Sequence, residues 1–581
     1  MSFQTMPLDQ VQRRSCAVLL VGSIALLVAL AARLAYINTT LRPRLVAIAN
    51  RQQQGQSVIP ARRGMIFDAR GRVVALDRQV PDVFVDPTLV DDVDRLAAKL
   101  GPRVNLPART IAERIRRRAD SRFVLIAPGV DAITAEAVRS MDCAAVGLTE
   151  RSRRSYPHGE SLSHVLGWVG RDGQGMEGIE LAYDTHLRGR SGRRTMIRDA
   201  RRRALGRSGQ LPVSPVDGGH LVLTIDAEIQ LIAEEALATG VRRFEAEGGS
   251  AIVMSPKDGS VLAMVCVPTF DPNEPVTAES AAARRNRAVT DPVEPGSSFK
   301  PIIACRALED GFVSTTERID CHMGSHRFGR RLVKDTSPQG LLDIRGIITR
   351  SSNIGMGLIA ERMGNEVLHD TLRRFGLGDR TGIDCPGESS GVVYPLHRWT
   401  SYSPTSLAMG YEVLVTPLQL INAFAAIVND GILMRPRLVR ELLGPRGEVI
   451  RSLDGPQIVR RVVSSQVARY MAQDLLVSVV ENGSGRRANT GPYRALGKTG
   501  TAKLVYDDRG GYEPGSYLSV FVGAAPVADP QIVVLVMVRR PNPRIGYYGA
   551  AVAAPVVGEI IKQTLAYLEV PPEAKSGLAS L

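Results

Sequence analysis

Two polar residues one helical turn apart, Ser297 and Lys300, could carry out acyl transfer. A serine hydroxyl is a poor nucleophile until a nearby base takes its proton, and a lysine can be that base when burial lowers its pKa. A spacing of three residues puts both side chains on one face of a helix. Pro301 fits only the first turn of such a helix. Ser297 is therefore expected near the helix N-terminus, where the dipole favours a developing alkoxide.

Two further polar motifs follow along the chain. Ser351-Ser352-Asn353 separates two helix-like segments, and taken alone it is interpreted as a helix cap. Residues 497–502 read Gly-Lys-Thr-Gly-Thr-Ala in a strand-like segment. Glycines in a strand let the backbone of a ligand approach closely.

Two glycine-containing segments resemble a phosphate-binding loop and a hydrolase nucleophile elbow, but neither has the required context. Five residues, not the four of a phosphate-binding loop, separate Gly491 from Gly497, and a strand-like segment follows where that loop needs a helix. Residues 387–391 match Gly-x-Ser-x-Gly. A proline precedes them and a β-like run follows, so the strand–turn–helix elbow of a hydrolase is missing and we expect a loop.

The ordered set S-x-x-K, S-x-N and K-T-G is the signature of penicillin-binding proteins and serine β-lactamases. Beyond these motifs the chain resembles class B penicillin-binding proteins over nearly its whole exported length. Within that class it is most similar to division-specific and sporulation-type enzymes, which are penicillin-binding protein 3-like. The residues that carry the resemblance are Arg63–Asp68 with Gly71; Arg154–Pro157, Gly159, His164, Gly167 and Gly170; Gly175, Glu177, Gly178 and Glu180; Arg285–Ala288; Val415–Gln419; and Tyr547–Gly549 with Ala553–Pro555. One departure is Glu412, where many relatives carry glycine.

The resemblance implies a peptidoglycan D,D-transpeptidase that cross-links stem peptides through a serine acyl-enzyme. Ser297 would attack the D-Ala-D-Ala carbonyl, Lys300 would accept its proton, and Ser351 would relay a proton to the leaving D-Ala amine. β-Lactams would acylate the same serine. A D,D-carboxypeptidase side activity is also compatible with this chemistry.

The remaining motif residues are expected to bind substrate. Asn353 would hold the substrate amide and the lysine, and Lys498 would add positive potential. Thr499 and Thr501, with Gly500 between them, would bind the terminal carboxylate. Backbone N–H groups of the nucleophile and of Thr501 would form the oxyanion hole. The stem peptide would lie as an added strand along this segment, and neither a metal nor a cofactor is expected.

These motifs need a scaffold, and the sequence predicts an α+β domain around them. Two β-like runs flank Pro-Lys-Asp-Gly at 256–259, which is a hairpin signal. Two more runs, 518–526 and 531–539, have a connection short enough for an antiparallel pair. A helix is predicted after the N-cap Asp226, and another at roughly 551–568. We therefore expect the penicillin-binding-protein/β-lactamase-like fold, an antiparallel sheet with helices on both faces.

One apolar run determines the location of the chain. Residues 16–32 carry no charge, and at about 1.5 Å per residue they just span a hydrocarbon core of roughly 30 Å. Arg13 and Arg14 precede the run and favour a cytoplasmic N-terminus. Arg33 follows the run, so the positive-inside rule does not assign the orientation unambiguously. A cleaved signal peptide is the competing interpretation, because residues 29–31 resemble a cleavage site. Either way the catalytic part is exported, and the anchored form is a single-pass protein of the inner (cytoplasmic) membrane.

The length of 581 residues suits two or three domains, and 44% hydrophobic with 23% charged residues indicates that most of the chain is globular. Residues 205–219 are rich in Gly, Pro and Ser and predict a domain boundary. The predicted parts are a cytoplasmic tail (1–14), a transmembrane anchor (15–37), an elongated α+β pedestal or dimerisation-type domain (38–215), the transpeptidase domain (216–570) and a second tail (571–581).

The formal net charge of +14 fits either an anionic neighbour or an arginine-rich solvated surface, with equal weight. The six cysteines form no CxxC pair, and no disulfide pairing is predicted. Region 38–215 lacks the acidic pair of a glycan polymerase. The resemblance therefore implies a separate membrane-embedded glycosyltransferase of the shape, elongation, division and sporulation group as partner. It also implies cell-division proteins as partners, no nucleic acid, and a role in septal wall synthesis.

Two alternative functions fit the sequence less well. A secreted β-lactamase would not need so large an exported domain before the catalytic one, and no acidic motif suited to deacylation lies between Asn353 and Lys498. A division scaffold with an inactive site is disfavoured by the intact motif residues. Division, sporulation and elongation roles stay open at this stage, as does the acceptor amino acid of the stem peptide.

Overall fold

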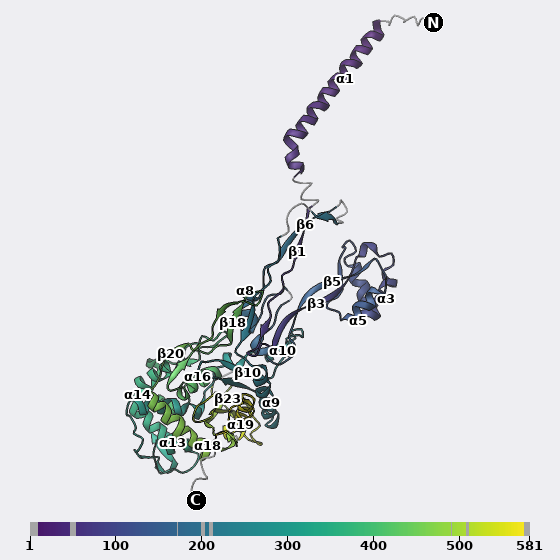
Figure 1. Ribbon diagram of the computed structural model, residues 1–581. Helices are drawn as coiled ribbons and strands as arrows, with labels where there is room; N and C mark the ends of the chain where they lie inside the picture. The colour runs from purple at the N-terminus through teal and green to yellow at the C-terminus, as the bar shows by residue number, and fades with distance from the viewer. Residues whose placement is uncertain are drawn as a thin grey trace. The chain divides into compact units, whose positions relative to one another are not determined.

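The computed structural model describes residues 10–46, 54–170, 172–198, 204–207, 213–489, 491–506 and 510–573. The chain divides into two compact units (Figure 1). The first comprises Met1–Ala61 and Arg190–Asp217, and the second comprises Arg62–Gly189 and Gly218–Leu581.

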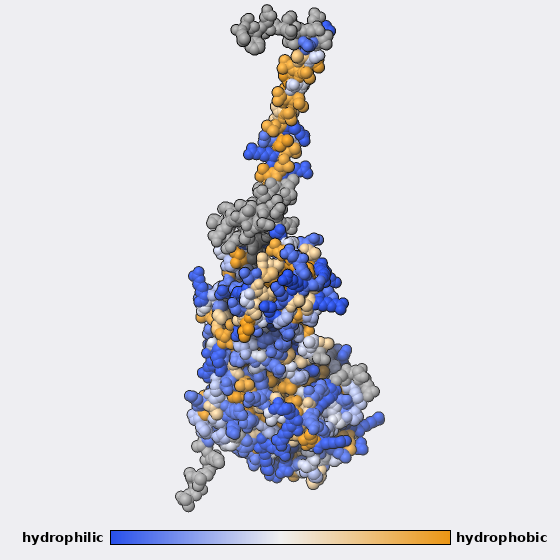
Figure 2. Space-filling view, turned by 90° about the vertical axis from the view of Figure 1, so that its right-hand side faces the viewer, coloured by the Kyte–Doolittle hydropathy of each residue, from blue (hydrophilic) through white to orange (hydrophobic). Residues whose placement is uncertain are grey.

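The first unit contains one long apolar helix. Helix α1 (Gln10–Tyr36) continues through a π-helical turn, η1 (Ile37–Leu41). The stretch Gln12–Val46 is long and apolar enough to cross a membrane, and Figure 2 shows its side chains as mostly hydrophobic. This confirms the predicted apolar helix, which both an anchor and a signal sequence require.

The first unit also contains a three-stranded sheet in the order β1-β6-β7. Its strands are β1 (Gln54–Ile59), β6 (Gly192–Arg198) and β7 (Ala204–Arg207). Residues 208–212 of the predicted boundary segment lie outside the described residues.

Five antiparallel strands form the central sheet of the second unit, in the order β10-β9-β23-β22-β21. They are β9 (Gly248–Met254), β10 (Val261–Val267), β21 (Leu496–Val505), β22 (Tyr512–Ala525) and β23 (Ile532–Arg539). Both predicted antiparallel pairs are confirmed, because β9 pairs with β10 and β22 pairs with β23. Strand β21, which carries the Lys-Thr-Gly motif, lies at one edge of this sheet.

Helices cover both faces of the central sheet, as the fold prediction required. Helices α9 (Ala227–Arg243) and α19 (Gly549–Tyr567) pack on one face, and α16 (Pro417–Val428) packs against β9 and β23. On β9, Val253 belongs to the apolar cluster with α9 and α19, whereas its neighbour Ile252 belongs to the other cluster. This alternation follows from the two-residue period of a strand. The expected N-cap is present, since the Asp226 carboxylate accepts a hydrogen bond from the N–H of Glu228.

Outside the two larger sheets, the chain between β10 and β21 is mostly helical, and besides α16 it contains the elements that carry the first two motifs. Its helices are α10 (Ala278–Ala283), α11 (Arg287–Thr290), η3 (Gly296–Phe299), α12 (Lys300–Glu309), η4 (His322–Gly324), α13 (Ile344–Arg350), α14 (Asn353–Arg374), η5 (Leu396–Arg398), α15 (Ser403–Ala408), α17 (Ser465–Arg469), η6 (Tyr470–Leu476), α18 (Val477–Glu481) and η7 (Arg486–Ala488). Its short strands are β11 (Ile319–Asp320), β12 (Ser325–Phe328), β13 (Arg331–Lys334), β14 (Leu341–Leu342), β15 (Val392–Val393), β16 (Val413–Leu414), β17 (Ile432–Met434) and β20 (Ile458–Arg461).

A second, seven-stranded sheet joins chain segments from both sides of the predicted domain boundary. Its strands are β2 (Ile66–Phe67), β3 (Val73–Val85), β4 (Val124–Ala127), β5 (Val146–Ser155), β8 (His220–Leu223), β18 (Val439–Leu443) and β19 (Val449–Ser452). Strand β2 pairs in parallel with β8, where Ile66 lies opposite Leu221, and β8 pairs with β18. The short helices near this sheet are α6 (Ser163–Leu166), α7 (Gly178–Ala182) and α8 (Asp184–Leu187).

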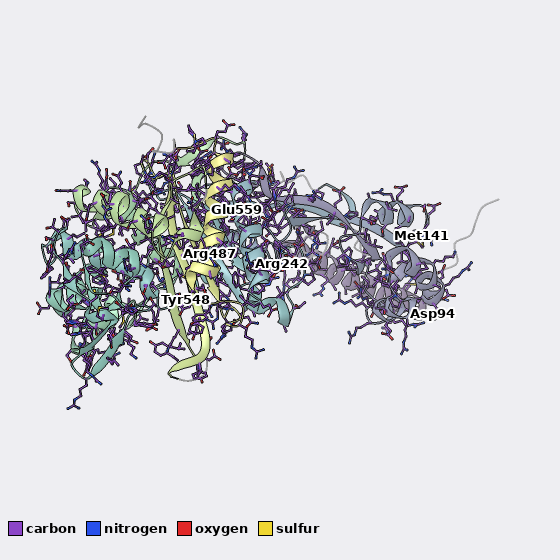
Figure 3. The ribbon with its side chains drawn as sticks, turned by 90° about the horizontal axis from the view of Figure 1, so that it is seen from below. Asp94, Met141, Arg242, Arg487, Tyr548 and Glu559 are labelled. Carbon is purple, nitrogen blue, oxygen red and sulfur yellow. The ribbon has the colours of Figure 1, made fainter. Side chains whose placement is uncertain are left out.

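Strands β3 and β5 form a long ribbon that leads to a small helical subdomain (Figure 1). Its elements are η2 (Pro87–Leu89), α3 (Val93–Val104), α4 (Ala108–Arg116) and α5 (Ala132–Arg139), which share one apolar cluster with β4. Figure 3 shows Asp94 and Met141 together in this subdomain, away from Tyr548 at the central sheet. The subdomain therefore has its own small core, separate from the two clusters around the central sheet.

Several residues upstream of residue 190 that carry the family resemblance, among them Arg63, Arg154 and Glu180, meet in a buried network of ion pairs. Glu180 is fully buried, and its carboxylate accepts from Arg63 Nε and from Arg154 Nε, each at 2.6 Å. Arg63 also pairs with Asp184 at 2.6 Å, and Arg154 with Asp77 at 3.3 Å. Two arginine side chains thus pair with three carboxylates from separate segments. These ion pairs hold β2, β5 and α7 together.

Candidate active site

The turn that carries Ser297 is tightly enclosed. Ser297 lies in η3, which leads directly into α12, and Pro301 occupies the first turn of α12 as predicted. Gly296 has φ +58°, a conformation that favours glycine, and its N–H donates to the carbonyl of Gly410 at 3.2 Å. A Cβ on Gly296 would lie 2.9 Å from the carbonyl oxygen of Thr501. The backbone next to Ser297 therefore packs directly against strand β21.

The ammonium group of Lys300 is buried and faces the second motif. Its Nζ donates to the carbonyl oxygen of Ser351 at 2.6 Å, to Asn353 Oδ1 at 2.9 Å and to Ser351 Oγ at 3.3 Å. Burial lowers the pKa of Lys300 to about 7, and the Asp335 carboxylate acts in the opposite direction. Lys300 can therefore change its protonation state near neutral pH, which a general base must do.

Lys498 of β21 also reaches the second motif. Its Nζ donates to Ser351 Oγ at 3.0 Å and to the carbonyl oxygen of Thr499 at 3.1 Å. Burial and the charge of Lys300 together hold the pKa of Lys498 well below its usual range. The hydroxyl of Ser351 therefore connects two buried lysines, and the charge of Lys300 disfavours the charged form of Lys498.

The three residues of the second motif have different structural positions. Ser351 ends α13 in a left-handed conformation, with φ +58° and ψ +40°, which is strained for a residue other than glycine. Ser352 is the N-cap of α14, and its Oγ accepts from the N–H of Gly355 at 3.0 Å. Asn353 Nδ2 donates to the carbonyl of Lys334 at 2.9 Å, which turns its Oδ1 towards Lys300. The cap interpretation is thus correct for Ser352, while Ser351 and Asn353 face the lysines.

Strand β21 presents the third motif along the sheet edge. Thr499 Oγ1 lies 2.8 Å from Ser484 Oγ, and Thr501 Oγ1 accepts from the N–H of Gly549 at 3.0 Å. A Cβ on Gly500 would lie 2.8 Å from the carbonyl oxygen of the proline before Gly296. The glycine thus permits the close approach of β21 to the serine turn.

Glu294 connects the serine turn to two other segments. Its Oε1 accepts from the N–H of Glu412 at 3.0 Å, and its Oε2 accepts from Tyr512 Oη at 2.9 Å. Burial raises the pKa of Glu294. Glu412, the departure from the resemblance, has φ +59°, and its Oε2 accepts from Ser403 Oγ at 2.8 Å. A left-handed backbone is thus present at the position where glycine was expected.

The box at residues 547–549 builds an aromatic stack beside β22. The ring of Tyr547 stacks on Tyr517 at 4.0 Å and on Tyr548 at 4.4 Å, and Ser519 Oγ donates to the Tyr547 carbonyl at 2.6 Å. Figure 3 labels Tyr548 at the N-terminal end of α19, the helix that also carries Glu559.

The structure thus brings Lys300, Ser351, Asn353 and Lys498 into mutual contact and places the Thr499–Thr501 backbone beside the turn of Ser297. Three contacting residues were not predicted: Asp335, Ser484 and Glu294. The first two lie in loops and belong to no motif. Glu294 had a weak signal, since an acidic residue directly precedes the Pro-Gly turn.

The chain matches two known families in sequence. Residues 249–562 match the penicillin binding protein transpeptidase domain, and residues 58–223 match the penicillin-binding protein dimerisation domain. Among curated relatives, stage V sporulation protein D of Bacillus subtilis is 33% identical, with 97% of this chain and 87% of the relative covered. The peptidoglycan D,D-transpeptidase FtsI of Escherichia coli is 32% identical, with 96% of this chain and 92% of the relative covered.

A solved structure has the same fold. Penicillin binding protein 3 of Mycobacterium tuberculosis, complexed with aztreonam, is 28% identical and superposes with a TM-score of 0.69, covering 89% of this chain and 98% of that one. With the ordered motifs gathered in one site and both family domains present, the chain belongs to the class B penicillin-binding proteins and is a serine-type peptidoglycan D,D-transpeptidase.

Proposed function

We propose that Ser297 is the nucleophile of this transpeptidase and that neutral Lys300 is the base that activates it. The observation that carries this proposal is the buried lysine itself. Its Nζ is held by oxygens of Ser351 and Asn353, and burial lowers its pKa to about 7. A lysine in this state can take a proton from a hydroxyl one helical turn away.

In the proposed acylation step Ser297 Oγ forms a bond to the carbonyl carbon of the penultimate D-Ala while its proton passes to Lys300. The carbonyl oxygen becomes an oxyanion, which the N–H groups of Ser297 and Thr501 would stabilise, because their backbones lie side by side. The C–N bond to the terminal D-Ala then breaks, and its amine takes a proton through Ser351, which contacts both lysines. An amine of a second stem peptide then attacks the acyl-enzyme and releases Ser297.

The donor peptide would bind along strand β21. This strand is the edge of the central sheet and so has backbone groups available for an added strand. The terminal carboxylate of the donor would lie between the hydroxyls of Thr499 and Thr501, in the positive potential of Lys498. The hydrogen bonds from Ser484 and Gly549 would fix the two threonine side chains for this task.

β-Lactams would acylate the same serine, a proposal supported by the solved complexes of the mycobacterial relative with aztreonam and with ampicillin. The test is a fluorescent penicillin added to purified Ser297→Ala beside the wild-type chain. We expect a covalent label on the wild type and none on the variant, with an unchanged melting temperature. A stable adduct on the variant would show that the nucleophile is assigned wrongly.

We further propose a role in septal wall synthesis, with the catalytic part outside the inner membrane and the chain anchored by α1. The resemblance to division-specific and sporulation-type enzymes supports this role, and the apolar helix α1 supports the anchor. Cell-division proteins and a membrane-embedded glycosyltransferase of the shape, elongation, division and sporulation group would be its partners.

The partner proposal is tested by supplying lipid II to this chain alone and with an added polymerase. We expect cross-linked glycan only in the second reaction, because the segment matching the dimerisation domain would carry no sugar-transfer chemistry. Glycan strands made by the chain alone would contradict the proposal.

A further inference from the structure

Asp335, the residue directly after β13, is bonded to the corner between α13 and α14. Its Oδ2 accepts from Ser352 Oγ at 2.6 Å, and its Oδ1 accepts from the N–H groups of Asn353 at 2.5 Å and Ile354 at 3.1 Å. Its own N–H donates to the carbonyl of Gly324 at 3.0 Å. The carboxylate therefore satisfies N–H groups at the start of α14 and lies where the helix dipole favours negative charge.

The same hairpin orients the side chain of Asn353. The carbonyl of Lys334 accepts from Asn353 Nδ2, which leaves Asn353 Oδ1 for the bond from Lys300. All three oxygens that Lys300 contacts belong to residues 351 and 353, on either side of the Ser352 hydroxyl that donates to Asp335. A shift of this corner would move the whole acceptor set of the lysine.

Two titratable groups from other elements lie near Lys300. Lys498 on β21 shares the Ser351 hydroxyl with it, and Asp335, in the loop after β13, acts on it through its charge. The other contacting side chains, Ser351 and Asn353, are uncharged. The attraction of Asp335 favours the protonated form of Lys300 and raises its pKa against the larger effect of burial, and the charge of Lys300 in turn lowers the pKa of Lys498.

We propose that Asp335 is a positioning residue with two effects: it fixes the Ser351–Asn353 corner around Lys300, and its charge sets the pH range in which Lys300 can accept the proton of Ser297. This inference rests on the proposed role of Lys300 as the base. It assigns no contact between Asp335 and the substrate.

The substitution Asp335→Asn separates charge from geometry, because an amide keeps an oxygen that can accept from the N–H groups of Asn353 and Ile354. Without the negative charge Lys300 loses its proton more easily. In the plot of acylation rate against pH, the acid limb is the part where the rate falls as the pH decreases. This limb should therefore move to lower pH, by about half to one unit. A role in holding the backbone alone would lower the rate without moving this limb.

Two further variants keep the test decisive if Asp335→Asn folds poorly. Asp335→Glu retains the negative charge, so the acid limb of this variant should stay within about 0.2 pH units of wild type. Its rate should fall, because the longer side chain changes the geometry of the corner. Asp335→Ala removes all three acceptor bonds and should lower the rate at every pH by about 10- to 100-fold. A limb that moves to lower pH in the glutamate variant would overturn the proposal.

Asp343 provides a matched control, because its carboxylate caps the neighbouring helix α13 by accepting from the N–H of Gly346 at 2.7 Å. Asp343→Asn should leave the acid limb unchanged. Rates are measured with a fluorescent penicillin between pH 5 and 9 on the full chain in detergent. An unmoved limb in Asp335→Asn, or an equal shift in Asp343→Asn, contradicts the inference. A wild-type chain that does not label, or a Lys300→Ala variant that labels normally, contradicts the proposed function instead.

Discussion

At the scale of single residues, the site contains a lysine that is buried among neutral oxygens. Lys300 is completely buried, and its bonding partners are neutral oxygens, so its charged form is poorly solvated. A lysine in water is protonated at neutral pH and cannot act as a base. In the proposed mechanism this burial is what allows Lys300 to act as a base.

The burial of Lys300 predicts the pH dependence of acylation. Lys300 must be neutral to take the proton of Ser297, so the penicillin acylation rate should fall as the pH drops through about 7. Lys300→Ala should lower the rate by about 10²–10⁴-fold. Lys300→Arg should be equally slow, because a guanidinium stays protonated. A variant rate within a few-fold of wild type at pH 8 would remove Lys300 from the mechanism.

Glu412 supports a prediction about backbone strain. Its φ of +59° costs a residue with a Cβ about 1–2 kcal/mol, and glycine avoids this cost. Glu412→Gly and Glu412→Ala both lose the bond to Ser403, so the difference between them isolates the strain. We expect the glycine variant to have a melting temperature a few degrees above that of the alanine variant. Equal melting temperatures would show that no strain is stored there.

At the scale of elements, the sequence predicted what periodic patterns and short motifs encode. The alternating runs around residues 256–259 and 518–539 formed hairpins of the central sheet, and Pro301 and Asp226 marked helix starts correctly. Asp335 and Ser484 could not be predicted, because they reach the site through tertiary folding of loops that carry no spacing signal. The sequence could not distinguish the helix-capping role of Ser352 from the roles proposed for Ser351 and Asn353. The three side chains point in different directions because of the left-handed backbone at Ser351.

The ion network of Glu180 makes a prediction at this scale. Glu180→Ala would leave the guanidinium groups of Arg63 and Arg154 buried beside fewer carboxylates, which typically costs about 3–5 kcal/mol. The variant should lose the β2–β5–α7 region to limited proteolysis. Glu113→Ala is the control, because its pair with Arg109 is exposed and should matter by no more than about 1 kcal/mol. Equal proteolysis of both variants would contradict a structural role of the network.

At the scale of the whole molecule, the apolar helix α1 bears on the proposed anchoring of the enzyme in the membrane. Stem peptides belong to a wall that is assembled next to the membrane, and a retained helix would keep the active site near that surface. The helix is long and apolar over the stretch Gln12–Val46. This is sufficient for insertion by composition.

We therefore expect the chain to remain in the membrane fraction after washing with high salt or carbonate, since no charge interaction is needed to hold it. A protease added outside the cytoplasm should reach the transpeptidase domain. N-terminal sequencing provides the decisive check. A mature protein that starts near Ala32 or Arg33 would replace the anchor by a cleaved signal peptide.

The parallel pairing of β2 with β8 and the antiparallel pairing of β8 with β18 have a consequence for how the chain folds during its synthesis. Residue Ile66 needs Leu221 as its partner, and Leu223 needs Val439, so the seven-stranded sheet closes only after about three quarters of the chain has left the ribosome. Long-range pairings of this kind form late, and the early segments must wait with an unpaired strand edge. A nascent chain arrested at residue 215 would lack β8 and should remain sensitive to protease. The seven-stranded sheet can therefore fold completely only after the strands of the catalytic domain have been synthesised, and an incomplete chain lacks this sheet.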